Sequence, residues 1–245
     1  MIEFSHVSFR YAAAPARALK DVSFRVGAGE LVVLTGRSGC GKSTLTSLVN
    51  GLLPRHEEDE TGGSVTICGR DASSMEGYEI ARLVGSVFQN PKSQFFNLDT
   101  DSEIAFGLEN AGVPNPALRD RVEETIDEVG IRQLAGRSIF EMSGGQKQQV
   151  AIAGAYALGP EIFVLDEPSA NLDHQATIRL AELLGELRSR GKALLVCEHR
   201  LGYLSHLADR YVVLDAGAVA GNYSADEFRA CLLYTSPSPR DGLLS

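Results

Sequence analysis

Residues 36–44 read GRSGCGKST and constrain the fold more than any other stretch of the sequence. They match the pattern G-x-x-x-x-G-K-[ST], between an apolar run typical of a buried strand (30–36) and a segment with helical spacing of leucines (42–53). Glycines let the backbone curl so that successive N–H groups point at phosphate oxygens, and the start of a helix adds partial positive charge. The stretch therefore predicts an α/β fold with a nucleotide at this turn.

The loop residues have separate expected roles. Lys42 is expected to reach the β- and γ-phosphates, and the Ser43 hydroxyl to ligate Mg²⁺. A glycine-rich turn without a ligand is the alternative, but a chance match in a chain of this length has odds on the order of one in a hundred. The other loop residues expected to line the nucleotide are Gly36, Ser38, Gly39, Cys40, Gly41 and Thr44.

The segment IFVLDEP (162–168) ends a hydrophobic strand with two acids. In a parallel sheet that end of the strand faces the same crevice as the phosphate loop. Asp166 is therefore predicted to hold Mg²⁺, and Glu167 to act as the general base that polarises the attacking water. A solvated strand end is the alternative for such a pair considered alone.

The segment MSGGQKQQ (142–149) resembles a known family. Ser143, Gly144, Gly145 and Gln146 resemble the LSGGQ signature of ABC transporter ATPases, with Met142 in place of leucine. The N–H groups after Ser143 open a helix, which is again an anion site. In this family two chains pair head to tail, and each signature caps the γ-phosphate held by the other chain. The resemblance thus implies a second ABC ATPase chain as partner, identical or related.

Other family positions match in order. Gln89 resembles the Q-loop glutamine, a sensor of Mg²⁺ and water that couples the site to a membrane subunit, and His199 resembles the switch histidine that contacts the γ-phosphate. SANLD (169–173) resembles the D-loop, which implies that Asp173 crosses the dimer interface. Tyr11 resembles the aromatic residue that stacks on adenine, with an ordinary surface tyrosine as the alternative.

The resemblance covers residues 1 to about 230 and implies an α/β P-loop NTPase fold. That fold has an antiparallel β subdomain, a RecA-like core and a helical signature subdomain inserted at about 91–158. The residue pattern agrees with such an arrangement, because strand-like and helix-like segments alternate through the middle of the chain. It also predicts an edge strand at 2–10 and a solvated acidic loop at 56–63.

Residues 86–107, SVFQNPKSQFFNLDTDSEIAFG, lead from a predicted core strand into the helical insertion. In ABC ATPases this region forms the groove for a coupling helix of the membrane partner. Phe95 and Phe96 would suit that groove, and packing inside the subdomain is the alternative for either of them. The amino-acid sequences of this stretch, of residues 9–24 and of NGLLPR (50–55) resemble those of ATPases of energy-coupling factor (ECF) transporters.

ECF transporters are bacterial and archaeal importers of vitamins or of transition-metal ions such as cobalt and nickel. The resemblance implies a transmembrane scaffold subunit that docks near Gln89 to Phe96, and a small membrane subunit that captures the solute. The prediction is therefore an ATP-hydrolysing subunit of an importer. Three alternatives stay open: an importer served by a soluble binding protein, a non-transport ABC protein acting on ribosomes or DNA, and an inactive regulatory half. Glu167 and His199 argue against the last.

Composition narrows these classes. The formal net charge of −9 argues against non-specific binding to nucleic acid or anionic lipid. No apolar run approaches the roughly 18 residues that a membrane span needs, and the first ten residues do not resemble a signal peptide. The expected location is peripheral, on the cytoplasmic face of the membrane. The cysteines show no metal-ligand spacing and are expected to be free thiols: Cys40, Cys68, Cys197 and Cys231.

The last fifteen residues, CLLYTSPSPRDGLLS (231–245), form a separate segment. Residues 231–241 resemble the translation of an adapter used to prepare sequencing libraries, and 242–245 fit the sequence that follows it. We expect this segment to be a non-native tail on an ABC ATPase domain of residues 1–230. A flexible tail rich in serine and proline is the alternative.

Overall fold

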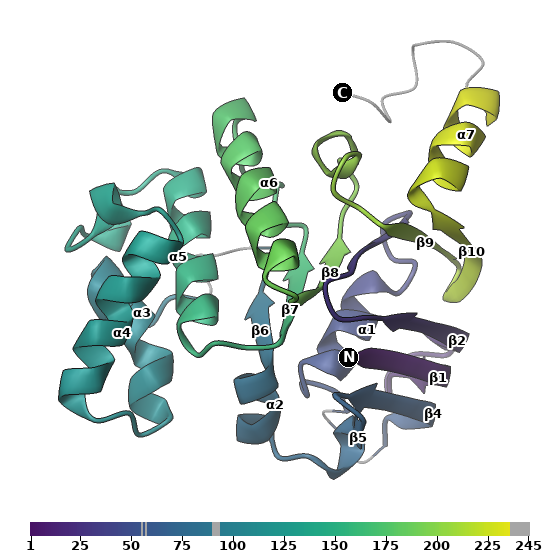
Figure 1. Ribbon diagram of the computed structural model, residues 1–245. Helices are drawn as coiled ribbons and strands as arrows, with labels where there is room; N and C mark the ends of the chain where they lie inside the picture. The colour runs from purple at the N-terminus through teal and green to yellow at the C-terminus, as the bar shows by residue number, and fades with distance from the viewer. Residues whose placement is uncertain (55, 57, 90–93, 236–245) are drawn as a thin grey trace.

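The computed structural model describes residues 1–54, 56, 58–89 and 94–235, with no side chains described for 232–235. The chain forms two β-sheets, one antiparallel and one mostly parallel, with helices beside them (Figure 1). The antiparallel sheet has the strand order β2-β1-β4-β5. Its strands are β1 (Ile2–Arg10), β2 (Leu19–Val26), β4 (Glu60–Ile67) and β5 (Arg70–Asp71).

The larger sheet has the order β10-β9-β3-β8-β7-β6. Neighbours in it pair in parallel, except that β10 pairs with β9 in an antiparallel hairpin. Buried parallel strands lack polar alternation because both faces are covered. The strands are β3 (Leu31–Gly36), β6 (Val84–Val87), β7 (Ile162–Asp166), β8 (Ala193–Cys197), β9 (Arg210–Asp215) and β10 (Ala218–Ser224).

Helices lie on both faces of the parallel sheet, and further helices lie beside it at one end of the molecule (Figure 1). Successive side chains of a strand point to opposite faces. Val32 and Leu34 accordingly join α1 and the antiparallel sheet, whereas Leu31 and Val33 join α5 and α6. The helices are α1 (Lys42–Val49), α2 (Gly77–Leu83), α3 (Thr100–Asn110), α4 (Asn115–Glu128), α5 (Gly144–Ala157), α6 (His174–Ser189) and α7 (Ala225–Thr235).

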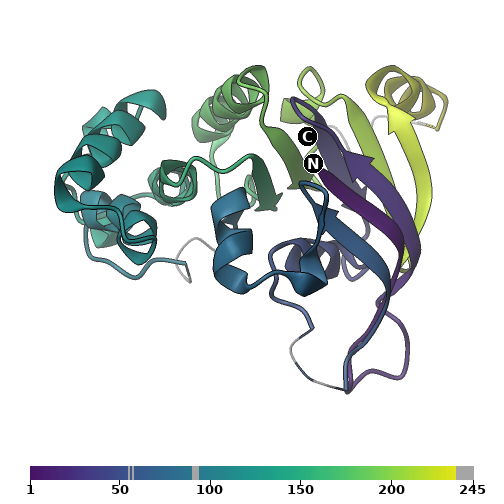
Figure 2. The ribbon, with the colours of Figure 1, turned by 60° about the horizontal axis from the view of Figure 1, so that its bottom comes forward.

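Helices α3, α4 and α5 lie together at one end of the molecule, away from the antiparallel sheet (Figures 1 and 2). They pack around a hydrophobic cluster of their own, which includes Ile104, Ile126 and Val150. This separate core gives the helical part of the chain its own support.

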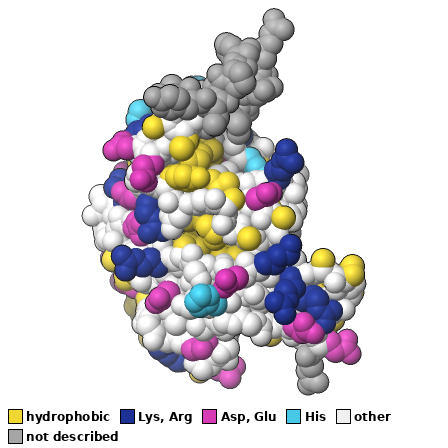
Figure 3. Space-filling view, turned by 90° about the vertical axis from the view of Figure 1, so that its right-hand side faces the viewer, with side chains coloured by type: hydrophobic (Ala, Val, Ile, Leu, Met, Phe, Trp, Pro, Cys, Tyr) yellow, Lys and Arg dark blue, Asp and Glu magenta, His cyan; other side chains and the backbone are white. Residues whose placement is uncertain are grey.

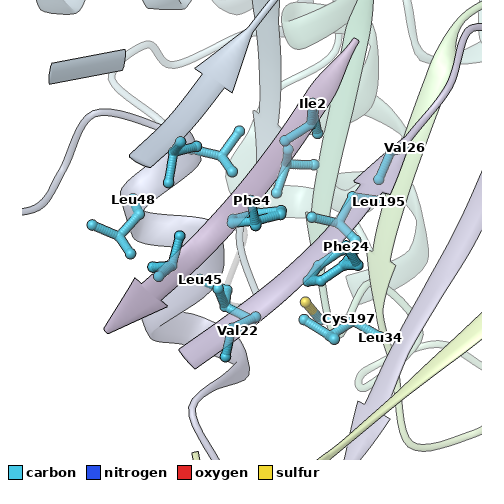
Figure 4. Close-up of a cluster of buried hydrophobic side chains, with 14 of the residues drawn as sticks. Ile2, Phe4, Val22, Phe24, Val26, Leu34, Leu45, Leu48, Leu195 and Cys197 are labelled. Atoms are coloured by element: carbon cyan, nitrogen blue, oxygen red, sulfur yellow. The ribbon is translucent and has the colours of Figure 1, made fainter. Parts of the chain in front are cut away.

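The largest core cluster lies between the antiparallel sheet, α1 and the parallel sheet (Figure 4). Phe4 of β1 and Phe24 of β2 stack with ring centroids 4.5 Å apart. Leu45 of α1 and Leu195 of β8 complete the same layer. The cluster therefore ties the antiparallel sheet to the helix that follows the phosphate loop.

Two sequence-based expectations for the antiparallel sheet are wrong. β1 is an inner strand that pairs with β2 and β4, and its slip in alternation is a bulge at His6, whose φ is 52°. Glu60 to Gly63 belong to β4 rather than to an acidic loop, and Glu60 forms an ion pair with Arg10 across the strands. The cross-strand cation makes an acidic residue suitable for a strand. Positions 55 and 57 lie outside the described residues.

The surface shown in Figure 3 carries a group of hydrophobic side chains with Lys, Arg, Asp and Glu interspersed around it. Charges of both signs thus share this face. Within the described part of the chain, none of the helices has the length and apolar character needed to cross a membrane.

Phe4→Ala tests how much the largest core cluster contributes to the stability of the fold. Phe4 is 1% exposed, so its loss should lower the free energy of unfolding by about 3–5 kcal/mol, through lost burial and the cavity left behind. Urea unfolding followed by circular dichroism would measure this. Tyr78→Ala, at a side chain that is 66% exposed, should change stability by no more than about 0.5 kcal/mol. Equal losses of unfolding free energy in the two variants would contradict the stabilising role of the core cluster.

Candidate nucleotide-binding and hydrolysis site

The phosphate loop connects the end of β3 to the start of α1, and two of its glycines are sterically required. Gly36 has φ 145°, and a Cβ there would lie 2.1 Å from the Leu214 carbonyl oxygen. Gly41 has φ 110°, and a Cβ there would lie 2.8 Å from the Ala18 carbonyl oxygen. Any side chain at these positions would push the loop away from its neighbours, so the loop shape depends on glycine.

Lys42 is 5% exposed, and its ammonium donates to the carbonyl oxygens of Gly36 (2.9 Å) and Arg37 (3.2 Å). Helix α1 begins at Lys42, and no side chain among the described residues caps its first N–H groups. A helix N-terminus with a cation beside it suits an anion such as a phosphate. Ser38 and Gly39 are exposed at the loop tip. The Cys40 N–H donates to the Arg37 carbonyl at 3.2 Å, so this group closes the turn.

Tyr11 lies beside the phosphate loop. Its hydroxyl is 3.1 Å from Thr44 Oγ1, and its ring meets Phe9 edge-on with centroids 4.9 Å apart. The side chain is 36% exposed. The residue therefore presents a fixed, accessible aromatic ring next to the helix that follows the loop.

Asp166 ends β7 and hydrogen-bonds Ser43. Burial raises the pKa of this carboxyl group, and the neighbouring Glu167 charge raises it further. The Ser43 hydrogen bond and the Lys42 charge act in the opposite direction. The ionised carboxylate is thus held in an environment that only partly compensates its charge.

Glu167 is the meeting point of the remaining catalytic candidates. Its Oε2 accepts a hydrogen bond from Gln89 Nε2 at 2.8 Å, and its Oε1 lies 3.2 Å from His199 Nε2. Its backbone has φ 46° and its N–H donates to the Cys197 carbonyl at 2.8 Å. A left-handed conformation at a residue other than glycine persists only where its surroundings hold it.

The oxygen ligands at this site fit magnesium bound together with a nucleotide. Ser43 supplies a hydroxyl group and Asp166 a carboxylate, and Mg²⁺ typically takes one or two carboxylates and completes its shell with phosphate and water. Among the described residues, no group of three His, Cys, Asp or Glu side chains could hold a metal ion. The residues present therefore suit an ion that arrives with phosphate ligands.

The segment 143–146 starts helix α5. Ser143 Oγ accepts from the Gln146 N–H at 3.3 Å, and Gln146 Oε1 accepts from the Ser143 N–H at 3.0 Å, which forms a capping box. A Cβ on Gly144 would lie 3.0 Å from the Asn171 carbonyl oxygen, and one on Gly145 would lie 2.7 Å from Ala176 Cβ. The glycines thus allow this segment to pack against residues 171–176.

The predicted site residues form two groups. The phosphate loop, Asp166, Glu167, Gln89 and His199 come together around the ends of the parallel strands, and Tyr11 lies beside α1. The other group contains segment 143–146 and Asp173, whose carboxylate caps α6 by accepting from the Ala176 N–H at 2.8 Å. Helix α5 packs on α3, α4 and β6, whereas α1 packs on β3, β4 and β7 (Figure 1).

A groove of about 260 Å³ lies between α2 and β6 on one side and α3 and α5 on the other. Phe96 lines it, is 72% exposed and stacks on Phe106 at 4.8 Å. Phe95 instead packs against two core clusters, which settles the alternative that the sequence left open for this residue. Positions 90–93 of the predicted docking stretch lie outside the described residues.

Two buried carboxylates of this region escaped the sequence analysis. Glu103 is 8% exposed and accepts from the N–H groups of Phe96 (3.0 Å) and Asn97 (2.8 Å), so it holds the groove residue in place. Glu198 is 2% exposed beside His199. An acid at the end of a strand ordinarily indicates a solvated terminus. The one sequence signal for Glu198 is its position next to His199, the predicted switch histidine.

Asp166→Asn tests the charge balance of the site. The pKa of Asp166 is higher in the folded state than in the unfolded state, so ionisation lowers the free energy of unfolding. This loss begins as pH rises past the unfolded-state pKa and is complete above the folded-state pKa. We expect the variant to melt at a higher temperature than the parent chain at pH 8 in EDTA. The difference should shrink at pH values below the usual carboxyl range. A lower melting temperature at pH 8 would contradict the assignment.

The comparisons with known proteins agree with this geometry. Residues 19–170 match the family model for the ABC transporter. An ABC transporter ATP-binding protein of Treponema denticola is 44% identical over 228 residues, which cover 93% of this chain and 47% of that protein. The chain spans about half the length, or less, of the first curated relatives it matches.

Solved structures show the same fold. CbiO1 of Clostridium perfringens, described as part of the ABC transporter complex CbiONQ, matches with TM-score 0.83 and 26% identity, over 96% of this chain and 95% of that one. The dimeric ATP-binding cassette MJ0796 bound to ADP and Pi matches with TM-score 0.79 and 26% identity, over 92% and 99%. The phosphate loop, the strand-end acids and these likenesses together show that this chain belongs to the ABC transporter family as an ATP-binding cassette.

Proposed function

We propose that this chain hydrolyses ATP to drive a membrane importer of the ECF type. The observation that carries the proposal is the meeting of Glu167 with Gln89 and His199 beside the phosphate loop. These three side chains come from the ends of different strands. An isolated nucleotide-binding loop would need none of them, whereas hydrolysis requires a base that is held in position.

Each residue has a place in the reaction. Lys42 and the first N–H groups of α1 hold the phosphates, and the Tyr11 ring stacks on the adenine. Mg²⁺, held by Ser43, Asp166 and Gln89, would neutralise charge on the transferred phosphoryl group. Glu167 orients the attacking water and accepts its proton. His199 contacts the γ-phosphate, and Gln89 senses whether water and metal are in place.

The second group of residues acts on another cassette. Ser143 is exposed at the start of α5, where helix N–H groups can meet a phosphate that a partner cassette holds. Asp173 lies close by at the start of α6 and contacts the same partner. The dimeric form of the related cassette MJ0796 supports such a pair. Pairing of two identical or two related cassettes would both satisfy this arrangement.

The groove beside Phe96 supports a membrane partner. An exposed aromatic ring between helices, rimmed by polar groups, suits an amphipathic helix from a transmembrane scaffold subunit. The likeness to CbiO1, part of a CbiONQ complex, favours the ECF type, in which a small membrane subunit captures a vitamin or a metal ion. The chain would then lie on the cytoplasmic face of the membrane. A soluble capture protein would indicate the other importer class.

Glu167→Gln tests the general base. The amide keeps the size of the side chain but cannot accept a proton, so hydrolysis should fall by about 10²–10⁴-fold while ATP affinity stays within about twofold. Phosphate release and nucleotide titration would measure the two quantities. Glu109→Gln, at an exposed position of α3, is the matched control and should behave as the parent chain. Parent-like turnover in Glu167→Gln would overturn the assignment.

Separate replacements of Phe95 and Phe96 test the docking groove. Phe96→Ser should weaken co-purification with the transmembrane subunit at least tenfold, with melting temperature and ATP affinity nearly unchanged, because the ring is mostly exposed. Phe95→Ser should lower stability by about 1–3 kcal/mol because its ring packs against both core clusters. If Phe96→Ser retains the partner, the groove is not the docking site. The co-purified capture subunit, membrane-bound or soluble, distinguishes the importer classes.

A further inference from the structure

We propose that Glu198 is a positioning residue that joins the hydrolysis site to the segment 169–173, so that the two move as one unit. The inference rests on the proposed ATPase function. Neither the family match nor the residues predicted from the sequence assign any role to Glu198, and its importance follows from the contacts of its buried carboxylate.

Five donors converge on this carboxylate. Oε2 accepts from Ser169 Oγ at 2.6 Å, from the Tyr203 hydroxyl at 3.0 Å and from the Ser169 N–H at 3.4 Å. Oε1 accepts from the N–H groups of His199 at 2.8 Å and Arg200 at 3.0 Å. Both oxygens are therefore fully used, and the side chain has no freedom to turn away.

A carboxylate at position 198 suits these five donors. An ionised carboxylate is an acceptor at both oxygens, so it can satisfy five donors at once, and hydrogen bonds to a charged acceptor are the stronger ones. The Tyr203 phenol is protonated at neutral pH and donates to this carboxylate, and burial and the Glu198 charge raise its pKa further. Arg200 also donates to the Ser169 carbonyl at 3.2 Å. We call this hydrogen-bonded group the unit; its members are Ser169, Glu198, His199, Arg200 and Tyr203.

The unit completes a ring that passes through the catalytic pair. Ser169 follows Glu167 by two residues, and His199 directly follows Glu198. The ring closes where His199 Nε2 lies 3.2 Å from Glu167 Oε1. Glu198 thus adds a second link between the base and the histidine, beside the hydrogen bond from the Glu167 N–H to the Cys197 carbonyl.

The same unit reaches the surface that faces the partner cassette. Ser169 begins the segment that continues to Asn171, on which Gly144 packs, and to Asp173 at the start of α6. A displacement of this segment by a partner cassette would therefore move Ser169, and through Glu198 it would move His199. Hydrolysis would then depend on pairing without any direct contact between the partner and the histidine.

Tyr203→Phe and Ser169→Ala each remove one donor to Oε2 and leave the fold intact. We expect each to lower kcat about tenfold while the Kd for a non-hydrolysable ATP analogue stays within twofold. Tyr78→Phe, at an exposed tyrosine of α2, is the matched control and should leave kcat unchanged. Glu198→Gln should retain more activity than Glu198→Ala, because its remaining oxygen can still accept from His199 and Arg200 while its amide group donates to the two hydroxyls.

A double-mutant cycle with His199→Ala decides whether these residues act through the histidine. If they do, Tyr203→Phe should cost less than twofold in kcat when His199 is already absent. Equal tenfold losses in both backgrounds, or a parallel loss of nucleotide affinity and melting temperature, would overturn the proposal and leave Glu198 a structural residue. Parent-like turnover in Glu167→Gln would instead refute the general-base assignment, and this outcome does not depend on Tyr203.

Discussion

The parallel register of four strands is the constraint on which the site depends. Leu34 of β3 pairs with Cys197 of β8, Cys197 pairs with Asp166 of β7, and Leu165 pairs with Val87 of β6. Because the strands end in line, the residues that follow them emerge at one edge of the sheet. The phosphate loop, Glu198-His199, Glu167 and Gln89 meet there although 163 positions separate Gly36 from His199 in the chain numbering.

Bringing these groups together has an energetic cost that the surrounding structure offsets. Asp166 is ionised against a raised pKa, Glu167 has a left-handed backbone, and Glu198 is a buried charge. Ser43 and Lys42 offset the charge of Asp166, and the Cys197 carbonyl accepts from the Glu167 N–H. Five donors surround the Glu198 carboxylate. The large apolar cluster under β1 and α1 supplies stability at a distance from the chemistry, so the site can keep its strained and charged residues.

The helical part of the molecule has a different role from the sheets. Helices α3, α4 and α5 share a core of their own, and α5 also packs on β6, on α6 and on the core cluster beside the parallel sheet. At the start of α5, Gly144 and Gly145 pack on residues 171–176, and within the helical part Glu103 holds Phe96 beside the groove. The proposed contacts with a second cassette and with a membrane subunit thus start from different places, the start of α5 and the groove beside Phe96.

The sequence by itself determined the strand, loop and helix around residues 36–44, the acidic end of β7 and the identity of the family. These features are local, because glycine conformation, helix N-termini and strand hydrophobicity act within a few residues. Only the tertiary structure decided that β1 is an inner strand, that Phe95 is packed while Phe96 is exposed, and that Glu198 collects five donors. Those outcomes depend on pairing and burial between distant segments, which no local pattern encodes.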